Sequence, residues 1–394
     1  MGRAHPDTPP APPLSDAGLT GDWGGVRTRL AGDGLTFYGG YVSELAYNAT
    51  GGEHRVATEA GEIDLGFAAD LQRLAGLPGG VFKATLTDRR GHDLGQAADL
   101  GLLQEVQEIN GRGHTWRLTE FWYEQTLGAA RIKVGRSPPN TDFAAFSCEF
   151  QNLSFCSAAP GNFVTDTWFN WPIGQWSARL RVEGRNAYVQ AGAYVINPRD
   201  LEERLTLGYL NGATGVLYPF EIGWSPAIAG HAGTYKIGGW YSTADISGVA
   251  TAPKSSRFGG WIDIQQDLGA QLKTGGTGLS VFFNLTQADR GTAEIDQQVA
   301  VGLFYGGLIA ARPQDVVGLG LARTHLNGHI GDGQIGPTLP PRMGGAEYAA
   351  EAYYSFRPRS WLSLSPNLQL VEHPGGVTSR RAVVVLGLKA GLRL

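Results

Sequence analysis

The sequence contains no long apolar segment. None of its 394 residues belongs to a run near the roughly 18 consecutive apolar residues that a membrane-spanning helix requires. This absence excludes a helical membrane protein. The sequence also lacks a basic cluster, because its 32 lysines and arginines are scattered among 36 aspartates and glutamates, for a net charge of −4. Such a near-neutral balance argues against a nucleic-acid partner.

No secretory signal peptide is visible at the N-terminus of the sequence. The chain opens with a proline-rich stretch that includes Pro6 and Pro13 and has no apolar core. We expect residues 1–18 to form a disordered, proline-rich N-terminus. Either the sequence begins after a signal-cleavage site, which we favour, or the protein is not exported.

Cysteine is scarce. The two cysteines, Cys148 and Cys156, enclose a short polar and aromatic loop. A disulfide between them would be stable only in an oxidising compartment. We predict this disulfide, and two free thiols remain the alternative.

Glycine and aromatic residues, in contrast, are plentiful. The chain has 58 glycines, 10 tryptophans and 14 tyrosines, which is typical of many short strands joined by turns. Residues 19–34 differ from this pattern. They combine the helix-entry residue Asp22 with spaced apolar residues and end in glycine, which predicts one short amphipathic helical segment.

Apolar and polar residues alternate along much of the remaining chain. Near the C-terminus, Val384 and Leu386 share one face of the predicted strand and Lys389 lies on the other. A soluble all-β protein also alternates, but burying arginines and glutamates in its core would cost several kcal/mol each. We therefore predict that residues 35–394 form an all-β pore domain, a transmembrane antiparallel β-barrel of about 16 strands.

Four sequence blocks resemble one family. The segment Leu19–Leu30 resembles the N-terminal signature of the carbohydrate-selective porins, the OprB family. Blocks that begin at Glu120, Cys148 and Pro366 resemble the same family in the same order. Together these blocks extend over essentially the whole chain. The C-terminal Leu394 departs from the aromatic residue with which outer-membrane proteins usually end.

The resemblance implies a pore in a Gram-negative outer membrane, in contact with outer-membrane lipid, that passes monosaccharides or similar polyols by diffusion. It implies no cofactor, because passive diffusion needs neither a redox centre nor a nucleotide. A monomer and a homotrimer are both compatible with the sequence. A general diffusion porin or a polysaccharide export channel remains the alternative function.

A sugar-selective constriction needs forked donors, carboxylate acceptors and aromatic platforms, because a sugar presents hydroxyls in every direction and flat apolar ring faces. Inward strand positions and one proline-broken segment supply the candidate substrate-binding residues. These are Glu44, Asn48, Arg89, Glu120, Glu124, Arg131, Lys133, Trp168 and Trp171. For each charged residue alone, a solvated lumen wall is the alternative. For the tryptophans, the alternative is an interfacial aromatic girdle.

The segment from Ser137 to Phe163 is aromatic and poor in strand pattern. Held by the predicted disulfide, it is expected to narrow the channel. Carboxylates at Glu62, Asp64 and Asp70 share one inward face, but solvated carboxylates are the default there and we predict no metal site.

An enzyme is the remaining rival. Paired carboxylates such as Glu202 and Glu203 occur, but acidic pairs are common and glycoside hydrolysis also needs a set separation. The histidines have no metal-ligand spacing, and no Gly-x-Ser-x-Gly motif or phosphate loop is present. The sequence therefore predicts no catalytic residues and no enzymatic activity.

Overall fold

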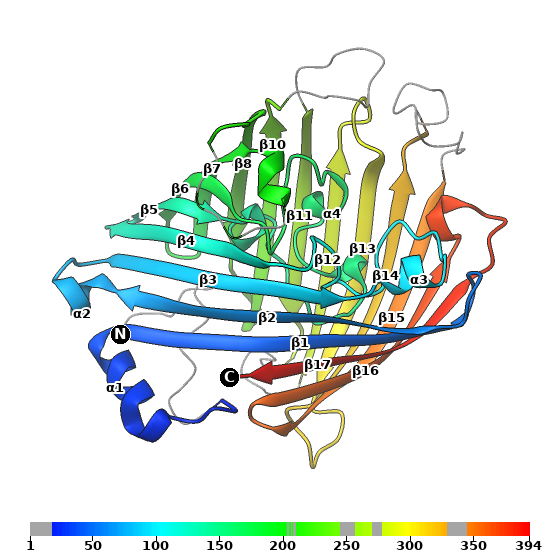
Figure 1. Cartoon of the computed structure of the whole chain (residues 1–394), viewed down its shortest axis with the longest axis horizontal. Coiled ribbons are helices and arrows are strands. Elements are labelled where there is room, and N and C mark those ends of the chain that lie inside the picture. Colours follow the sequence, from blue (N-terminus) through cyan, green and yellow to red (C-terminus); the bar gives the residue numbers. More distant parts are fainter. Residues whose placement is uncertain are drawn as a thin grey trace.

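The computed structural model shows one closed β-barrel with loops inside it (Figure 1). The described residues are 18–202, 205, 207, 210–244, 257–269, 278–328 and 345–394. Apart from Gly18, the segment expected to be disordered, residues 1–18, lies outside them. None of the described helices is long and apolar enough to cross a bilayer.

Sixteen long strands form the wall, as the alternation predicted. They are β1 (Leu35–Thr50), β2 (Ala57–Asp70), β3 (Gly80–Gly91), β4 (Trp116–Leu127), β5 (Ala130–Ser137), β6 (Gln175–Glu183), β7 (Ala187–Ile196), β8 (Gly215–Trp224), β10 (His231–Ser242), β11 (Arg257–Asp267), β12 (Gly278–Ala288), β13 (Ile295–Gly306), β14 (Val316–Leu326), β15 (Ala346–Arg359), β16 (Leu362–Glu372) and β17 (Val383–Arg393). The two-residue strand β9 (Ala227–Ile228) extends the hairpin between β8 and β10.

The barrel closes by pairing its first and last strands. Each long strand pairs antiparallel with its sequence neighbours, and β1 also pairs with β17, where Glu44 lies opposite Lys389. The connections define two rims. We call the end with tight connections, such as Leu127 to Ala130, the turn rim, and the end with the long 92–115 and 138–174 connections the loop rim.

Side-chain exposure alternates along the wall. In β1, Leu45 is 46% exposed whereas Glu44 is fully buried. In β8, Phe220 is 55% exposed and Glu221 is 1% exposed. Outward side chains are thus largely apolar and exposed, and polar side chains point into the lumen, as the period of two predicted for β1.

A bulge in β4 changes this alternation locally. Thr85 pairs with Glu120, but the next residue of β3, Leu86, pairs with Leu118. The extra residue allows Arg117 and Glu120 to be buried on the lumen side, although an odd number of positions separates them. A strict period of two could not have placed both there.

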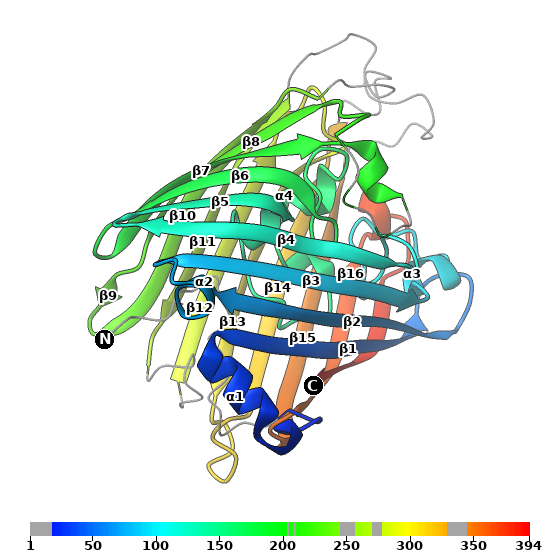
Figure 2. The ribbon, with the colours of Figure 1, turned by 60° about the vertical axis from the view of Figure 1, so that its left-hand side comes forward.

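The N-terminal helical segment lies at the turn rim, outside the lumen (Figures 1 and 2). It consists of η1 (Trp23–Gly25) and α1 (Val26–Asp33), so the predicted short helix is present. Asp22 accepts hydrogen bonds from both the backbone N and the Oγ1 of Thr28. The Arg27 guanidinium donates to the carbonyl oxygen of Leu394 at 3.1 Å and so ties the segment to the end of β17.

Short elements of the two long connections occupy the lumen. The 92–115 connection contains α3 (Leu94–Ala97), and the 138–174 connection contains η2 (Pro139–Thr141), η3 (Leu153–Phe155) and α4 (Pro160–Phe163). In Figures 1 and 2, α4 lies between opposite walls of the barrel. The expected loop from Ser137 to Phe163 therefore lies in the lumen.

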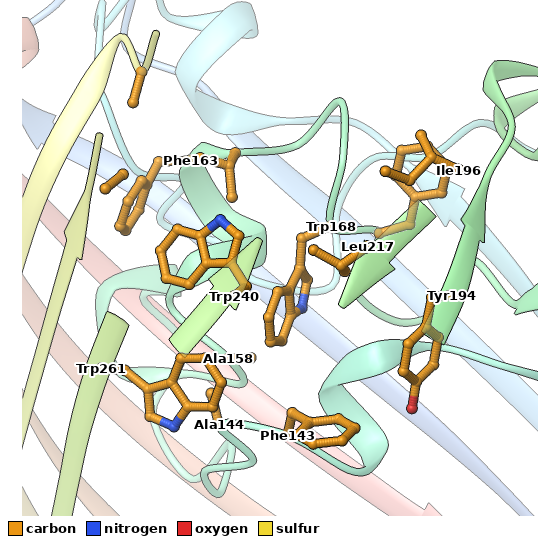
Figure 3. Close-up of a cluster of buried hydrophobic side chains, with 14 of the residues drawn as sticks. Phe143, Ala144, Ala158, Phe163, Trp168, Tyr194, Ile196, Leu217, Trp240 and Trp261 are labelled. Carbon is orange, nitrogen blue, oxygen red and sulfur yellow. The ribbon is translucent and has the colours of Figure 1, made fainter. Parts of the chain in front are cut away.

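Three tryptophans attach the 138–174 connection to the wall (Figure 3). The Trp168 ring centroid lies 6.0 Å from that of Trp240 on β10 and 5.6 Å from that of Trp261 on β11. All three side chains are at most 3% exposed. In this part of the lumen the packed loop takes the place of water. The inward-facing residues of β10 and β11 that contact the loop are therefore aromatic.

Candidate functional site

A cavity of about 600 Å³ lies in the lumen, between the wall formed by β1–β3 and β17 and the two inserted connections. Its charged and amide-bearing lining residues are Glu62, Arg89, Glu105, Glu108, Asn110, Arg112, Asn140, Asn162, Asn170 and Lys389. Trp171 and Phe146 supply aromatic surface. We call this space the central cavity.

One side of the central cavity is organised around Arg89. This residue lies opposite Glu62 in the β2–β3 register, and its Nε donates to Glu62 Oε2 at 2.5 Å. The indole Nε1 of Trp171 donates to the other carboxylate oxygen of Glu62 at 3.0 Å. The backbone N of Trp171 donates to Asn140 Oδ1 at 2.9 Å. The indole is thus fixed at both its backbone and its ring.

The other side carries carboxylates and one lysine. Lys389 Nζ donates to Glu108 Oε1 at 2.9 Å and lies 3.1 Å from Glu44 Oε1. In the 92–115 connection, burial and the nearby Asp93 raise the pKa of Glu105 to about 7. The central cavity therefore combines cationic and anionic groups at close range.

Arg112 is presented by an unusual backbone. It has φ +71°, and its neighbours Gly111 and Gly113 have φ +93° and +83°. A non-glycine residue in this left-handed region is uncommon and is enriched at functional sites. Burial lowers the pKa of the Arg112 guanidinium from its ordinary value.

Four predicted site residues form an ion-pair ladder on β4 and β5, next to the central cavity rather than in its lining. Glu120 accepts from Lys83 at 2.8 Å and from Thr85 Oγ1 at 2.6 Å. Glu124 pairs with Arg131 at 3.5 Å, and it also pairs with Arg179.

The last member of the ladder, Lys133, pairs with Asp142 and lies 5.2 Å from the centroid of the Trp122 ring. Asp142 belongs to the 138–174 connection. The ladder thus joins the inner wall to the inserted loop.

Three other predicted residues are fully buried and do not line the central cavity. Asn48 Nδ2 donates to the carbonyls of Gly51 and His54, and its Oδ1 accepts from Val56, so the β1–β2 connection uses its amide. Glu44 lies beneath the 92–115 connection and accepts from the backbone N of Ile109 at 3.3 Å.

Trp168 is the third of these buried residues. Its Nε1 donates to Asn170 Oδ1 at 3.0 Å within the tryptophan cluster of Figure 3. The structure therefore brings Arg89 and Trp171 of the predicted set to the central cavity and leaves Trp168 in the packing of the loop.

Sequence reasoning missed the loop residues of the cavity. Glu105, Asn110 and Arg112 come from a connection without regular alternation, so no period indicated where they would lie. Glu62 was on an inward face, but its pairing with Arg89 needed the strand register, and Trp171 reaches it from a segment 109 residues away. The one sequence signal for these loop residues was that Arg112 lies between two glycines, which indicates an unusual turn.

The disulfide joins Cys148 and Cys156 with 4.4 Å between their Cα atoms, so neither is a free thiol. Among the described residues, Glu108, Cys148 and Cys156 form a group of three potential metal ligands, but the disulfide uses both sulfur atoms and Glu108 pairs with Lys389. Asp70, one of the three carboxylates on the inward face of β2, accepts hydrogen bonds from the backbone N atoms of Gln72 and Arg73 at the start of α2 (Leu71–Ala75).

A closed barrel of sixteen strands, narrowed by its own loops around a polar and aromatic cavity, defines a porin. The family model described as carbohydrate-selective porin, OprB family, matches residues 54–394. The chain belongs to this family.

Relatives and solved structures agree with this assignment. The chain is 35% identical to Porin B of Pseudomonas aeruginosa, over 94% of this chain and 90% of that protein. It is 31% identical to the putative porin QuiX of Acinetobacter baylyi, over 95% and 92% of the two chains. The high-pH structure of Pseudomonas putida OprB superposes with a TM-score of 0.89 at 35% identity, covering 96% of this chain and 98% of that one.

Membership of this family establishes the general function of the protein. The protein is a carbohydrate porin of the Gram-negative outer membrane, a channel and not an enzyme. The OprB-family resemblance, the barrel and its strand number are thereby confirmed.

Proposed function

We propose that the central cavity is the selective constriction of this porin and that it passes monosaccharides such as glucose by passive diffusion. The observation that carries the proposal is the unit formed by Arg89, Glu62 and Trp171 in one cavity of about 600 Å³. This volume lies within the range of about 300 to 1,000 Å³ that small-molecule sites occupy.

Trp171 supplies the apolar platform. The side chain is partly exposed and lines the cavity, whereas Trp168 is entirely buried. A pyranose ring presents C–H groups on its faces, and an indole ring buries these groups at little entropic cost because it has few rotatable bonds. The bond to Glu62 holds the indole in place before a sugar arrives.

The polar groups supply the hydroxyl contacts. Arg89 and Arg112 offer guanidinium donors, and Glu62, Glu105 and Glu108 offer carboxylate acceptors. Because both signs of charge face the same space, a neutral polyol meets both donors and acceptors. A small ion meets repulsion from one of the two sets.

The path lies within one chain. Both inserted connections belong to the same barrel whose lumen they narrow, so a monomer and a homotrimer would each have one complete path per chain. The exposed outward residues of the wall, such as Phe220 and Leu386, form an apolar belt suited to outer-membrane lipid.

The ion-pair ladder on β4 and β5 plays a supporting role in this proposal. Glu120, Glu124, Arg131 and Lys133 each have an ionic partner in the wall or loop. Lys133 holds the 138–174 connection through Asp142, and the four residues together give the adjoining lumen wall its mixed charge. A solute that leaves the central cavity remains in a polar environment.

Single-channel recording in a planar bilayer tests the proposal. Glucose should reduce the current saturably, whereas a non-sugar solute of similar size should not. Trp171→Ala should raise the half-blocking glucose concentration about fivefold, since an aromatic contact is worth about 1 kcal/mol. The control is Trp224→Ala, at an outward position that is 49% exposed. A current that responds equally to glucose and to the other solute would instead identify a general diffusion porin.

A further inference from the structure

A second cavity lies in the lumen near the turn rim. Its volume is about 570 Å³, and we call it the turn-end cavity. Its lining residues from the wall are Arg181, Tyr188, Ser225, Pro226, Ala232, Gly233, Thr234, Lys236, Asp263, Ile264 and Gln265. The 138–174 connection supplies the remainder, Asp142 and residues 145–147.

The inserted loop separates the two cavities. Phe146 contributes to the lining of both. The loop is fixed on either side of this residue, because Asp142 pairs with Lys133 and the Ala145 carbonyl accepts from Lys236 Nζ. A solute that moves from the loop rim to the turn rim would thus meet the central cavity first and the turn-end cavity second.

One polar group of the turn-end cavity is left without a partner. Asp263 is 7% exposed, and its Oδ2 is buried with no hydrogen-bond partner among the described residues. A buried carboxylate oxygen in this condition carries a desolvation cost that a donor from a ligand would offset. The missing group is a donor, and sugar hydroxyls are donors.

The surrounding side chains suit a neutral ligand. Lys236 lies directly opposite Asp263 in the β10–β11 register, so one positive and one negative charge face the same space. The Arg181 guanidinium lies 3.7 Å from the centroid of the Tyr188 ring and is also 3.0 Å from Glu183. The hydroxyl of Tyr188 donates to Glu221 at 2.6 Å, which fixes the ring. The cavity therefore offers an aromatic ring in a fixed position and a buried carboxylate, without a net excess of either charge.

We propose that the turn-end cavity is a second monosaccharide subsite, in which Asp263 accepts hydrogen bonds from sugar hydroxyls after the sugar has passed Phe146. This inference rests on the proposed sugar constriction and extends it. Two subsites of moderate affinity in series allow a solute to enter and leave without being trapped at one tight site.

Glucose-induced current noise provides the test, because each subsite contributes its own residence time. The wild-type porin should show two residence times. Asp263→Asn should shorten one of them about tenfold, since the charge-assisted hydrogen bond is weakened, and leave the other unchanged. Trp171→Ala should shorten only the other. A single, reproducible unitary conductance without sugar, whatever its size, shows that each variant is folded and inserted.

The matched control is Asp267→Asn. Asp267 lies on the same inward face of β11, is 2% exposed, and also has a buried Oδ2 with no hydrogen-bond partner in the described chain. It lies outside the turn-end lining that the described residues form. Its substitution should leave both residence times unchanged.

The outcomes separate the two proposals. If Asp263→Asn behaves like Asp267→Asn while Trp171→Ala shortens a residence time, the second subsite is refuted and the central constriction stands. If Asp263→Asn shortens one residence time and Trp171→Ala has no effect, the turn-end subsite stands and the assignment of the central cavity fails. Wild-type current without glucose-induced noise would overturn both.

Discussion

Arg89 and Glu62 face each other across the β2–β3 register, with 2.5 Å between Nε and Oε2. The second oxygen of the same carboxylate accepts from Trp171 at 3.0 Å. One glutamate thus positions both the guanidinium and the indole that we assign to sugar binding. Its removal should affect both selectivity for charge and selectivity for sugar.

Glu62→Gln should make the pore more permeable to anions. Removing one negative charge about 6 Å from a passing ion changes its energy by about 0.7 kcal/mol in water, favourably for an anion and unfavourably for a cation, which together change the anion-to-cation permeability ratio about tenfold. The reversal potential in a potassium chloride gradient measures this ratio. Glu59→Gln is the control, because Glu59 is on the same strand but on the opposite face, where it accepts from Tyr41 and Ser43.

Trp168→Ala should destabilise the loop rather than weaken sugar recognition directly. Its ring is fully buried between Trp240 and Trp261, and truncating a buried tryptophan typically costs about 3–5 kcal/mol. Detachment of the 138–174 connection from the barrel wall should relieve part of this loss of stability. We expect a lower unfolding temperature and a larger, noisier conductance. A quiet current at wild-type conductance would contradict the role of this cluster in holding the loop.

Opening the Cys148–Cys156 disulfide should loosen the segment that it encloses. On the chain-entropy estimate, a loop of this length is stabilised by about 3 kcal/mol. Between the cysteines, the ring centroids of Phe150 and Phe155 lie 4.9 Å apart. Both rings belong to a buried cluster with residues of β12–β15, so packing also holds the segment. We expect reduction to increase unitary conductance modestly. No change on reduction, or in the Cys148→Ser/Cys156→Ser variant, would argue against control of pore width by this loop.

Phe146→Ala should join the two cavities. The side chain contributes to both linings and packs against Phe282 at 5.1 Å. Its removal should raise the conductance and bring the two glucose residence times closer together, because the barrier between the subsites falls. Phe283→Ala, on the opposite face of β12, should change neither quantity.

The barrel could be predicted from the sequence because its signal is local. Each strand shows its two faces within about ten residues, as Glu44 and Leu45 do, and turns separate the strands. The N-terminal helix was recognised for the same reason. These elements depend on their own residues more than on distant contacts.

The site could be predicted only in part, because it depends on loops and register. Arg89 lies in a regular strand and was placed on its inward face, and Trp171 was chosen for its proline-broken segment; both line the central cavity. Asn48 and Trp168 have suitable chemistry but are used by the protein itself, one in a connection and one in packing. Alternation indicates which face a residue occupies. It does not show whether a loop covers that face, and Glu44 is covered in this way.

The ion selectivity of the pore should also depend on pH through Glu105. Burial, together with Asp93, raises the pKa of this carboxyl to about 7, so it is protonated at pH 5 and ionised at pH 9. Ionisation adds a negative charge to the central cavity, and cation preference should therefore increase as pH rises through 7. Glu105→Gln should flatten this change, whereas Glu53→Gln, at an exposed position of the β1–β2 connection, should not.

The stability of the protein provides a second, independent readout of the same group. The pKa of Glu105 is higher in the folded than in the unfolded state, so the folded state binds more protons between about pH 4.5 and 7. This group therefore favours folding below that window, and the contribution is lost as pH rises through it. Wild-type stability should decline across this interval relative to Glu105→Gln. Parallel stability curves for the two proteins would show that Glu105 ionises as freely in the cavity as in the unfolded chain.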